Sequence, residues 1–412
     1  MTGRKPHLVV VNDFAHVNGG TAMVALSSAI ALAGRGYPVT VFAAVGPVMP
    51  ELKQEGVDVV CLGGHEITAN PNRLRAVFDG LWNRAAARRM REVLKRLDPA
   101  DTIIHIHGWT KALTAAPIAA ALNRRFSIVL TLHDYFAACP NGGFYDFPKG
   151  RICPLRAMSP SCLTCNCDKN SRAQKLWRVT RQMMQKRWGG IPGRIENVIT
   201  VSGFSRDLMA PYLPGDARLY DVRNPIQATQ EPPAVPGMNK PFAFVGRLSP
   251  EKGAILFAEA AAKARIPALF IGDGEQRQDV ATRCPEGVIT GWVAPEEVRR
   301  HLRSARALVL PSLCYETQGM TVLEAAACSL PAIVPDTCAA REAVNDGVTG
   351  LWFRGGDADD LAAKLTLLQD DNLVNRLGRA AYDRFWADPS TLERHILALE
   401  TVYFQILAAR TQ

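Results

Sequence analysis

Two cations in the second half of the chain are spaced for chemistry on a phosphorylated substrate. Arg247 and Lys252 follow a short apolar run, and Gly253 leads into an apolar stretch typical of a helix. Cations at the carboxyl end of a buried strand, beside a helix N-terminus, form a site suited to a diphosphate leaving group. The alternative is a surface loop in which Pro-Glu-Lys simply starts a helix.

Two carboxylates follow further along the chain. Glu316 and Glu324 stand eight positions apart, with Gly319 between them. We expect Glu316 to lie in a loop at a cleft and Glu324 to lie two turns inside a helix that begins near Thr321. Gly319 would let the backbone approach a sugar or phosphate closely, and free amides at the helix start could receive an anion. The alternative is that Thr321 and Glu324 form only a capping box and that Glu316 is an ordinary loop acid.

Buried strands alternating with helices are the elements that must position these side chains. Apolar runs without strict alternation indicate parallel strands covered on both faces. The expected strands are 8–11, 39–42, 57–61, 103–106, 128–132 and 198–201, then 242–245, 268–271, 288–290, 307–310 and 332–334. A Pro-rich linker at 230–241 separates the two series. The sequence therefore predicts an α/β protein with two doubly wound domains, whose ligands bind at the carboxyl ends of the strands.

We place the first domain at residues 1–225 and the second at 226–388. Residues 389–412 are expected to form a helix that packs back on the first domain.

In the order and spacing of its short motifs, the sequence resembles glycosyltransferase family 4, the retaining nucleotide-sugar transferases of GT-B fold. The resemblance covers nearly the whole chain. It rests on Gly19-Gly20, His105-Ile-His-Gly108, Thr131-Leu-His-Asp134, Val201-Ser-Gly-Phe-Ser205, Asn224-Pro225, Val245-Gly-Arg247 with Lys252, Gly272-Asp-Gly274, Gly291-Trp292 and the pattern from Glu316 to Glu324. Thr317-Gln318 stands where the family usually has Phe-Gly, and Ser329 replaces a usual glycine, which puts sugar selectivity in question.

The resemblance implies roles for the charged residues. Arg247 and Lys252 would hold the donor diphosphate, Glu316 would contact hydroxyls of the donor sugar, and Glu324 would contact the ribose hydroxyls. Because these cations can stabilise the departing diphosphate, no cofactor or divalent ion is expected to be required for catalysis. The implied reaction is a same-face displacement in which the departing phosphate helps to deprotonate the acceptor.

The resemblance also assigns residues around the reacting centre. His133 would sit beside the reacting carbon, although an orienting or core role is the alternative, and His107 is expected to be structural. The remaining residues implied in donor binding are Gly19, Gly20, Gly246, Gly319, Met320 and Thr321. The expected partners are a nucleotide-sugar donor, with UDP or GDP as the nucleotide, and a glycan or polyprenol-linked acceptor in bacterial surface-polysaccharide synthesis.

A long insertion at about 134–196 should overhang the acceptor side of the first domain, because it far exceeds an ordinary strand-to-helix connection. Cysteine thiolates within it could bind a structural zinc ion. The candidate ligands are Cys139, Cys153, Cys162 and Cys165, with Cys167 as an alternative. Free thiols, or an iron–sulfur or redox role, remain the other interpretations.

The segment 169–194 within this insertion holds eight basic residues and no acidic ones, in a chain whose net charge is +9. Its interspersed apolar residues favour a basic amphipathic helix that lies on an anionic membrane surface, while a solvated helical face is the alternative. A composition of 48% hydrophobic and 21% charged residues excludes a disordered or fibrous protein. We expect a cytoplasmic protein, peripheral on the inner face of the membrane.

Two other functions fit parts of the sequence. A zinc-stabilised nucleic-acid-binding protein would account for the cysteines and the basic run, but it would leave the cations and carboxylates of the second domain unexplained. A nucleotide-sugar epimerase of GT-B fold would use the same donor site without an acceptor. We therefore expect no nucleic-acid partner.

Overall fold

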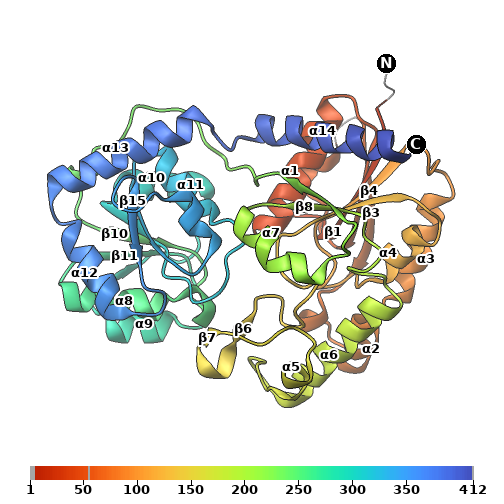
Figure 1. Cartoon of the computed structure of the whole chain (residues 1–412), viewed down its shortest axis with the longest axis horizontal. Helices are drawn as coiled ribbons and strands as arrows, with labels where there is room; N and C mark the ends of the chain where they lie inside the picture. The colour runs from red at the N-terminus through yellow and green to blue at the C-terminus, as the bar shows by residue number, and fades with distance from the viewer. Residues whose placement is uncertain (1–4, 54–55, 411–412) are drawn as a thin grey trace.

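The computed structural model describes residues 5–53 and 56–410, and it contains two parallel sheets covered by helices (Figure 1). The first sheet has the order β3-β2-β1-β4-β5-β8-β9 and the second β12-β11-β10-β13-β14-β15. This arrangement confirms the predicted fold class of two Rossmann-like α/β domains, the GT-B architecture.

The strands of the first sheet are β1 (His7–Phe14), β2 (Val39–Val45), β3 (Val57–Gly64), β4 (Thr102–Ile106), β5 (Ser127–Thr131), β8 (Asn197–Thr200) and β9 (Arg218–Asp221). Those of the second are β10 (Phe242–Val245), β11 (Ala268–Ile271), β12 (Val288–Ile289), β13 (Ala307–Val309), β14 (Ala332–Pro335) and β15 (Gly350–Phe353). A hairpin of β6 (Tyr145–Asp146) and β7 (Arg151–Ile152) lies in the insertion.

The helices of the first domain and its insertion are α1 (Gly20–Gly34), α2 (Arg73–Leu81), α3 (Arg84–Leu94), α4 (Ala116–Leu122), α5 (Pro160–Thr164), α6 (Arg172–Arg187) and α7 (Gly203–Met209). The remaining helices are α8 (Ala254–Ala264), α9 (Arg277–Arg283), α10 (Pro295–Arg303), α11 (Met320–Ala327), α12 (Ala358–Leu367), α13 (Asp371–Ala387) and α14 (Leu392–Arg410). Among the described residues, no helix has both the length and the apolar character needed to span a bilayer.

Every strand predicted from the sequence is present, with ends that differ by at most three residues, but β9 and β15 of the parallel sheets and the two-residue hairpin strands β6 and β7 were missed. β9 alternates poorly and is largely exposed at the sheet edge, so it lacks the apolar signal of a buried strand. β15 begins at Gly350, a residue type that is depleted in strands.

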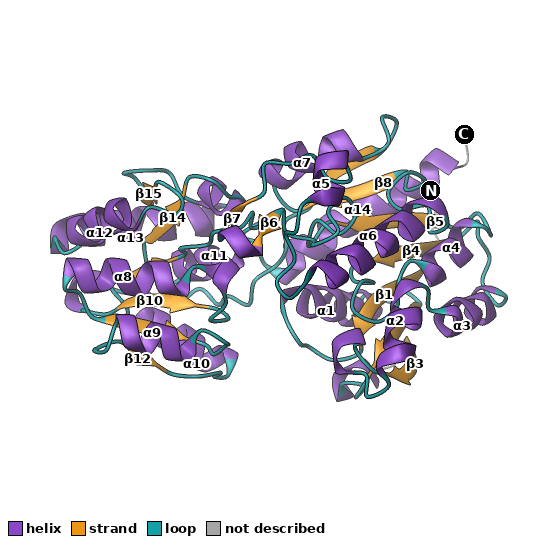
Figure 2. Cartoon of the chain, turned by 90° about the horizontal axis from the view of Figure 1, so that it is seen from below, coloured by secondary structure: helices purple, strands orange, loops and turns teal. Residues whose placement is uncertain are grey.

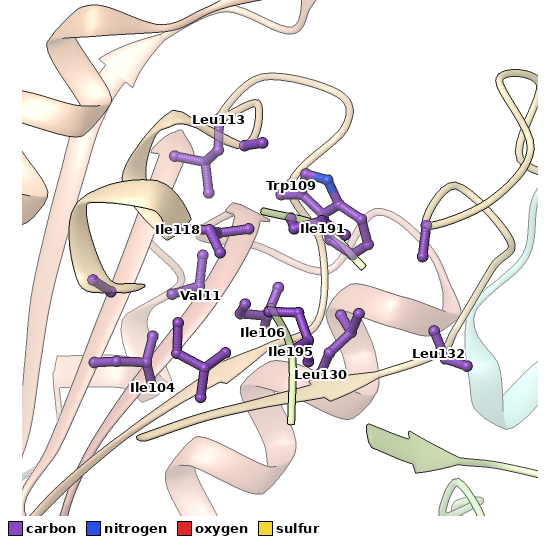
Figure 3. Packing of buried hydrophobic residues seen from close by; sticks show 14 of the residues in the cluster. Val11, Ile104, Ile106, Trp109, Leu113, Ile118, Leu130, Leu132, Ile191 and Ile195 are labelled. Atoms are coloured by element: carbon purple, nitrogen blue, oxygen red, sulfur yellow. The ribbon is translucent and has the colours of Figure 1, made fainter. Parts of the chain in front are cut away.

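Each face of the first sheet buries its own apolar cluster. On one face Val11, Ile104 and Ile106 pack against Trp109 and Ile118 (Figure 3). On the other face the strands pack against α1 and against Leu399 and Tyr403 of the terminal helix α14. The first sheet is therefore covered by apolar side chains on both faces, as expected for parallel strands.

The chain returns to the first domain after α13 of the second (Figure 1). The Tyr403 hydroxyl of α14 lies 2.7 Å from Nδ1 of His105 in β4, within hydrogen-bonding distance. His395 of the same helix is 2.8 Å from the carbonyl oxygen of Arg223 through its Nδ1. α14 therefore reaches the interior of the first domain beneath the motif His105-Ile-His-Gly108.

Candidate active site between the two domains

A cavity between the domains brings together motifs from both halves of the sequence. Gly20, Thr21 and His133 line it from the first domain, and residues that follow β10 and β13 line it from the second. A Cβ atom at Gly20 would lie 3.7 Å from Sδ of Met320 at the start of α11. Because β10 and β13 are neighbours in the sheet, the loops after them meet at one edge.

An ion pair lies in this cavity. Nζ of Lys252 is 2.8 Å from Oε1 of Glu316, and the Ser312 hydroxyl donates to the same oxygen over 2.6 Å. Burial opposes the charge on Glu316, but Lys252 and Ser312 outweigh it and hold the pKa of the carboxyl below its usual value. The same pairing overcomes burial and raises the pKa of Lys252, so both groups are charged at neutral pH.

Gly319 shapes the entry to α11. Its φ is 81°, and a Cβ there would lie 2.8 Å from the Cβ of Ala340, so only glycine fits without strain. Gly319 is the N-cap and no side chain caps the helix, which shows that the capping-box alternative for Thr321 was wrong. The exposed amides of the first turn, at Met320 and Thr321, border the cavity and favour an anion.

A second, largely apolar pocket adjoins this cavity, and Val245 and Gly246 line both. Glu324 lies in it, one turn into α11 and not two as predicted. Burial raises the pKa of Glu324 to about 7, and Arg299 acts against the shift only in part. Sequence reasoning missed Arg299, which lies on α10 within an otherwise ordinary run of surface charges.

Arg247 lies apart from Lys252. Nη2 of Arg247 donates to Oε1 of Glu251 over 3.0 Å, its side chain is 60% exposed, and it lines neither pocket. The pair is formed by residues four positions apart in one loop, so a local carboxylate competes with any ligand for this cation.

Three histidines lie in a row at the ends of β4 and β5, of which His105 and His107 are buried and His133 is half-buried. Nδ1 of His107 is 2.9 Å from Nε2 of His133, and Nε2 of His107 has no partner among the described residues. A buried N–H without an acceptor is costly, so we assign the proton to Nδ1 of His107. His133 then accepts through Nε2 and keeps an N–H at Nδ1.

These histidines are neutral at physiological pH. Burial lowers the pKa of His133 to about 3, with a smaller contribution from His395, and it lowers the pKa values of His105 and His107 as well. His133 can therefore donate or accept a hydrogen bond at the cavity, but it is a poor proton acceptor.

The two unusual residues after Glu316 link the domains. The Thr317 hydroxyl donates to the carbonyl of His133 over 3.3 Å, and Oε1 of Gln318 accepts from the amide of Asn224 over 2.7 Å. The hydroxyl of Ser202, at the start of α7, donates to the carbonyl of Thr317 over 2.6 Å. Thr317 and Gln318 thus position the loop that carries Glu316 against the first domain.

The cysteines of the insertion lie around one lysine. Nζ of Lys175, from α6, is 3.2 Å from Sγ of Cys167 and 3.7 Å from Sγ of Cys162. Cys139, Cys153 and Cys165 are near enough to these groups to influence one another electrostatically. In the part of the chain that the structure describes, no group of three or more potential ligands is arranged to hold a metal ion.

Most of the basic residues of 169–194 are already engaged. Lys169 pairs with Glu275, and Nε of Arg178 is 2.7 Å from Oδ2 of Asp168. Lys175 and Arg181 are buried, Arg181 donating to the carbonyl of Thr110, and Arg194 donates to Asn123. Arg172, Lys186 and Arg187 remain exposed, so the run presents far less free charge than its composition indicates.

Comparisons with known proteins identify the family to which the chain belongs. The model of "Glycosyltransferase Family 4" matches residues 18–229, and that of "Glycosyl transferases group 1" matches residues 239–371. A GDP-mannose-dependent alpha-mannosyltransferase of Corynebacterium glutamicum is 29% identical over an alignment that covers 36% of each chain. An alpha-maltose-1-phosphate synthase of Mycolicibacterium smegmatis is 26% identical over 86% of this chain and 94% of its own.

Solved structures share the fold over nearly the whole chain. Sucrose-phosphate synthase from Thermosynechococcus elongatus has a TM-score of 0.71 at 18% identity, covering 98% of this chain and 100% of that one. Anabaena Alr3699/HepE in complex with UDP and glucose has a TM-score of 0.67 at 15% identity, covering 97% and 100%. None of these comparisons supports a nucleic-acid-binding protein or an epimerase. The chain belongs to glycosyltransferase family 4 and is a glycosyltransferase of GT-B fold.

Proposed function

We propose that this glycosyltransferase moves a sugar from a nucleotide-sugar donor to a glycan or lipid-linked saccharide acceptor, with retention of the anomeric configuration, in bacterial polysaccharide synthesis. The observation that carries the proposal is the pair of adjoining pockets, one charged and one apolar, which meet at Val245 and Gly246. A nucleotide sugar has matching parts, a charged diphosphate between an apolar base and a polar sugar.

The donor fits these pockets in one orientation. The base and ribose would occupy the apolar pocket with Glu324 on the ribose hydroxyls, and the diphosphate would lie against Lys252 and the first amides of α11. The sugar would then extend toward Glu316 and His133. A structural neighbour solved with UDP and a relative named for GDP-mannose support a nucleotide-sugar donor, and UDP and GDP are the nucleotides to test first.

The proposed reaction breaks the bond between the anomeric carbon and the phosphate oxygen. The electron pair leaves with the diphosphate, whose growing charge the Lys252 ammonium and the helix amides stabilise. The acceptor hydroxyl attacks from the same face and passes its proton to the departing phosphate oxygen, so no other base is required. His133, neutral and held by His107, would donate a hydrogen bond from Nδ1 beside the reacting carbon.

Arg247 would join the diphosphate only after leaving Glu251. Its guanidinium is largely exposed, and the Ser249 hydroxyl also donates to Oε1 of Glu251, so this carboxylate keeps a hydrogen-bond partner when Arg247 leaves. The family resemblance supports this role of Arg247 in the loaded enzyme, and its exposure permits the movement.

We also keep the structural zinc site as a proposal. The Lys175 ammonium lies against Cys162 and Cys167, and among the described residues no three potential ligands are arranged for a metal ion, so zinc binding would require these side chains to rearrange. Metal analysis of protein purified without added metal tests the point, and less than about a tenth of an equivalent of zinc would reject it.

Incubation with a panel of nucleotide sugars and saccharide acceptors tests the function. We expect one donor to yield a product whose new glycosidic bond has the anomeric configuration of that donor, measured by proton NMR. An inverted product would refute retention, and product formed equally well by Lys252→Ala and Glu316→Ala variants would refute the site.

A further inference from the structure

Helix α2 has its apolar face turned to the outside. Leu74 and Phe78 are 75% and 69% exposed, and Val77 beside them is also exposed, whereas the buried positions are Ala76 and Gly80. A Cβ at Gly80 would lie 2.8 Å from the Trp177 ring, so the small residues are those that pack against the protein. A surface helix normally buries its large apolar residues. Their exposure here indicates a partner outside the chain.

Helix α6 of the insertion lies beside α2 (Figures 1 and 2). Nε1 of Trp177 donates to the carbonyl of Val77 over 3.0 Å. The Trp188 ring contacts Trp82 edge to face at 6.1 Å between centroids. Leu176 and Met183 of α6, and Trp188 directly after it, are exposed. Together with the three exposed apolar residues of α2 they form what we name the α2–α6 patch, whose members are Leu74, Val77, Phe78, Leu176, Met183 and Trp188.

The charged residues of α2 and α6 are basic except for Asp79. Arg73, Arg172, Lys186 and Arg187 are exposed on the same two helices. The acidic groups nearby are engaged, since Asp79 pairs with Arg75 at 3.0 Å and the buried Asp168 pairs with Arg178. An exposed apolar face with a cationic rim complements an anionic lipid surface, where apolar side chains and an interfacial Trp enter the headgroup boundary.

We propose that the α2–α6 patch docks this enzyme on an anionic bilayer. The free cations supply the electrostatic attraction, and the exposed Leu, Phe, Met and Trp side chains supply the apolar burial. Both terms are required, because the four exposed cations alone bind such a surface weakly and reversibly.

Docking at this face would bring the membrane close to the acceptor side of the site. The buried face of α6 donates from Gln182 and Gln185 to the carbonyl of Phe136, three residues after His133. One helix layer therefore separates the patch from the His133 loop. That the acceptor is lipid-linked rests on the proposed function together with this position of the membrane. The docking of the patch on a bilayer does not depend on the proposed function.

Vesicle flotation of the full chain tests the proposal. We expect flotation with phosphatidylcholine vesicles that contain about 30% phosphatidylglycerol and none with phosphatidylcholine alone. Lys186→Gln/Arg187→Gln and Leu74→Ser/Phe78→Ser should each weaken partitioning at least about tenfold. The matched controls, Lys240→Gln/Arg376→Gln and Val348→Ser/Leu367→Ser, change exposed residues of the second domain and should float like the parent chain.

Brominated lipids report on insertion directly. Trp188→Phe should remove most of the fluorescence quenching, while Trp292→Phe, which changes an exposed Trp of the second domain, should leave it in place. The proposal is overturned if the parent chain does not float, if patch and control variants float equally, or if the chain binds duplex DNA or RNA and not vesicles. Nucleotide binding by the patch variants should be unchanged, which separates a failure of docking from a failure of the proposed function.

Discussion

The unusual pKa of Glu324 predicts that donor binding depends on pH. The carboxyl binds ribose hydroxyls best when ionised, and its pKa of about 7 means that it takes up a proton as the pH falls through neutrality. If only the ionised form binds, the competent fraction falls from about nine-tenths at pH 8 to about one-tenth at pH 6. The dissociation constant of the nucleotide should then rise about tenfold, or about 1.4 kcal/mol.

Calorimetric titration with UDP and GDP from pH 6 to pH 8 measures this effect, and Glu324→Gln supplies the control. Glutamine preserves the size of the side chain but cannot ionise. At pH 8 the variant should bind about tenfold or more weakly, because hydrogen bonds to a charged group are stronger than those to a neutral one. Titration of the phosphate itself is common to both proteins and cancels in their ratio. A ratio that does not change between pH 6 and pH 8 would refute the assignment of Glu324.

Three further predictions concern the same site. Lys252→Met should lower the free energy of unfolding by about 2–3 kcal/mol in urea titrations, because it leaves the Glu316 carboxylate without its cation. The double variant Lys252→Met/Glu316→Gln should recover most of this loss. If the effects of the two substitutions are additive, the pairing is contradicted. Gly319→Ala should cost about 1–3 kcal/mol by the same measurement, owing to its positive φ, and a neutral result would contradict the strain. His107→Phe should lower kcat about tenfold without changing nucleotide affinity, since it removes the partner that orients His133; a weaker nucleotide affinity with unchanged kcat would contradict this.

The meeting of Lys252 and Glu316 could be predicted from the sequence because each follows a short apolar strand. Parallel strands end at the same edge of their sheet, so the loops after β10 and β13 converge whatever their detailed conformation. The family motifs also indicated the order of these loops along the chain. The fold class and the place where Lys252 and Glu316 meet could therefore be predicted from local sequence patterns.

The side-chain partners could not be predicted in the same way. Arg247 pairs with Glu251 and does not line the cavity. The spacing of residues in the sequence does not show which of these two positions the side chain takes. Arg181 and Lys175 belong to a run that looks solvated, yet both are buried because α6 packs over the insertion loop. The orientation of α2 depends on Trp177, about a hundred residues later, so no window of sequence around α2 shows which face is outward.

The cavity containing Lys252 and Glu316 is proposed to bind the diphosphate of a nucleotide-sugar donor. The most direct measurement compares the binding of UDP and GDP to the parent chain and to Lys252→Ala by calorimetry, with circular dichroism to verify that the variant is folded. We predict that at least one nucleotide binds the parent chain and that a folded Lys252→Ala variant binds it at least tenfold more weakly, the loss of a charge-assisted contact. Equal binding by the two proteins, or no binding of either nucleotide to the parent chain at millimolar concentration, would contradict the account.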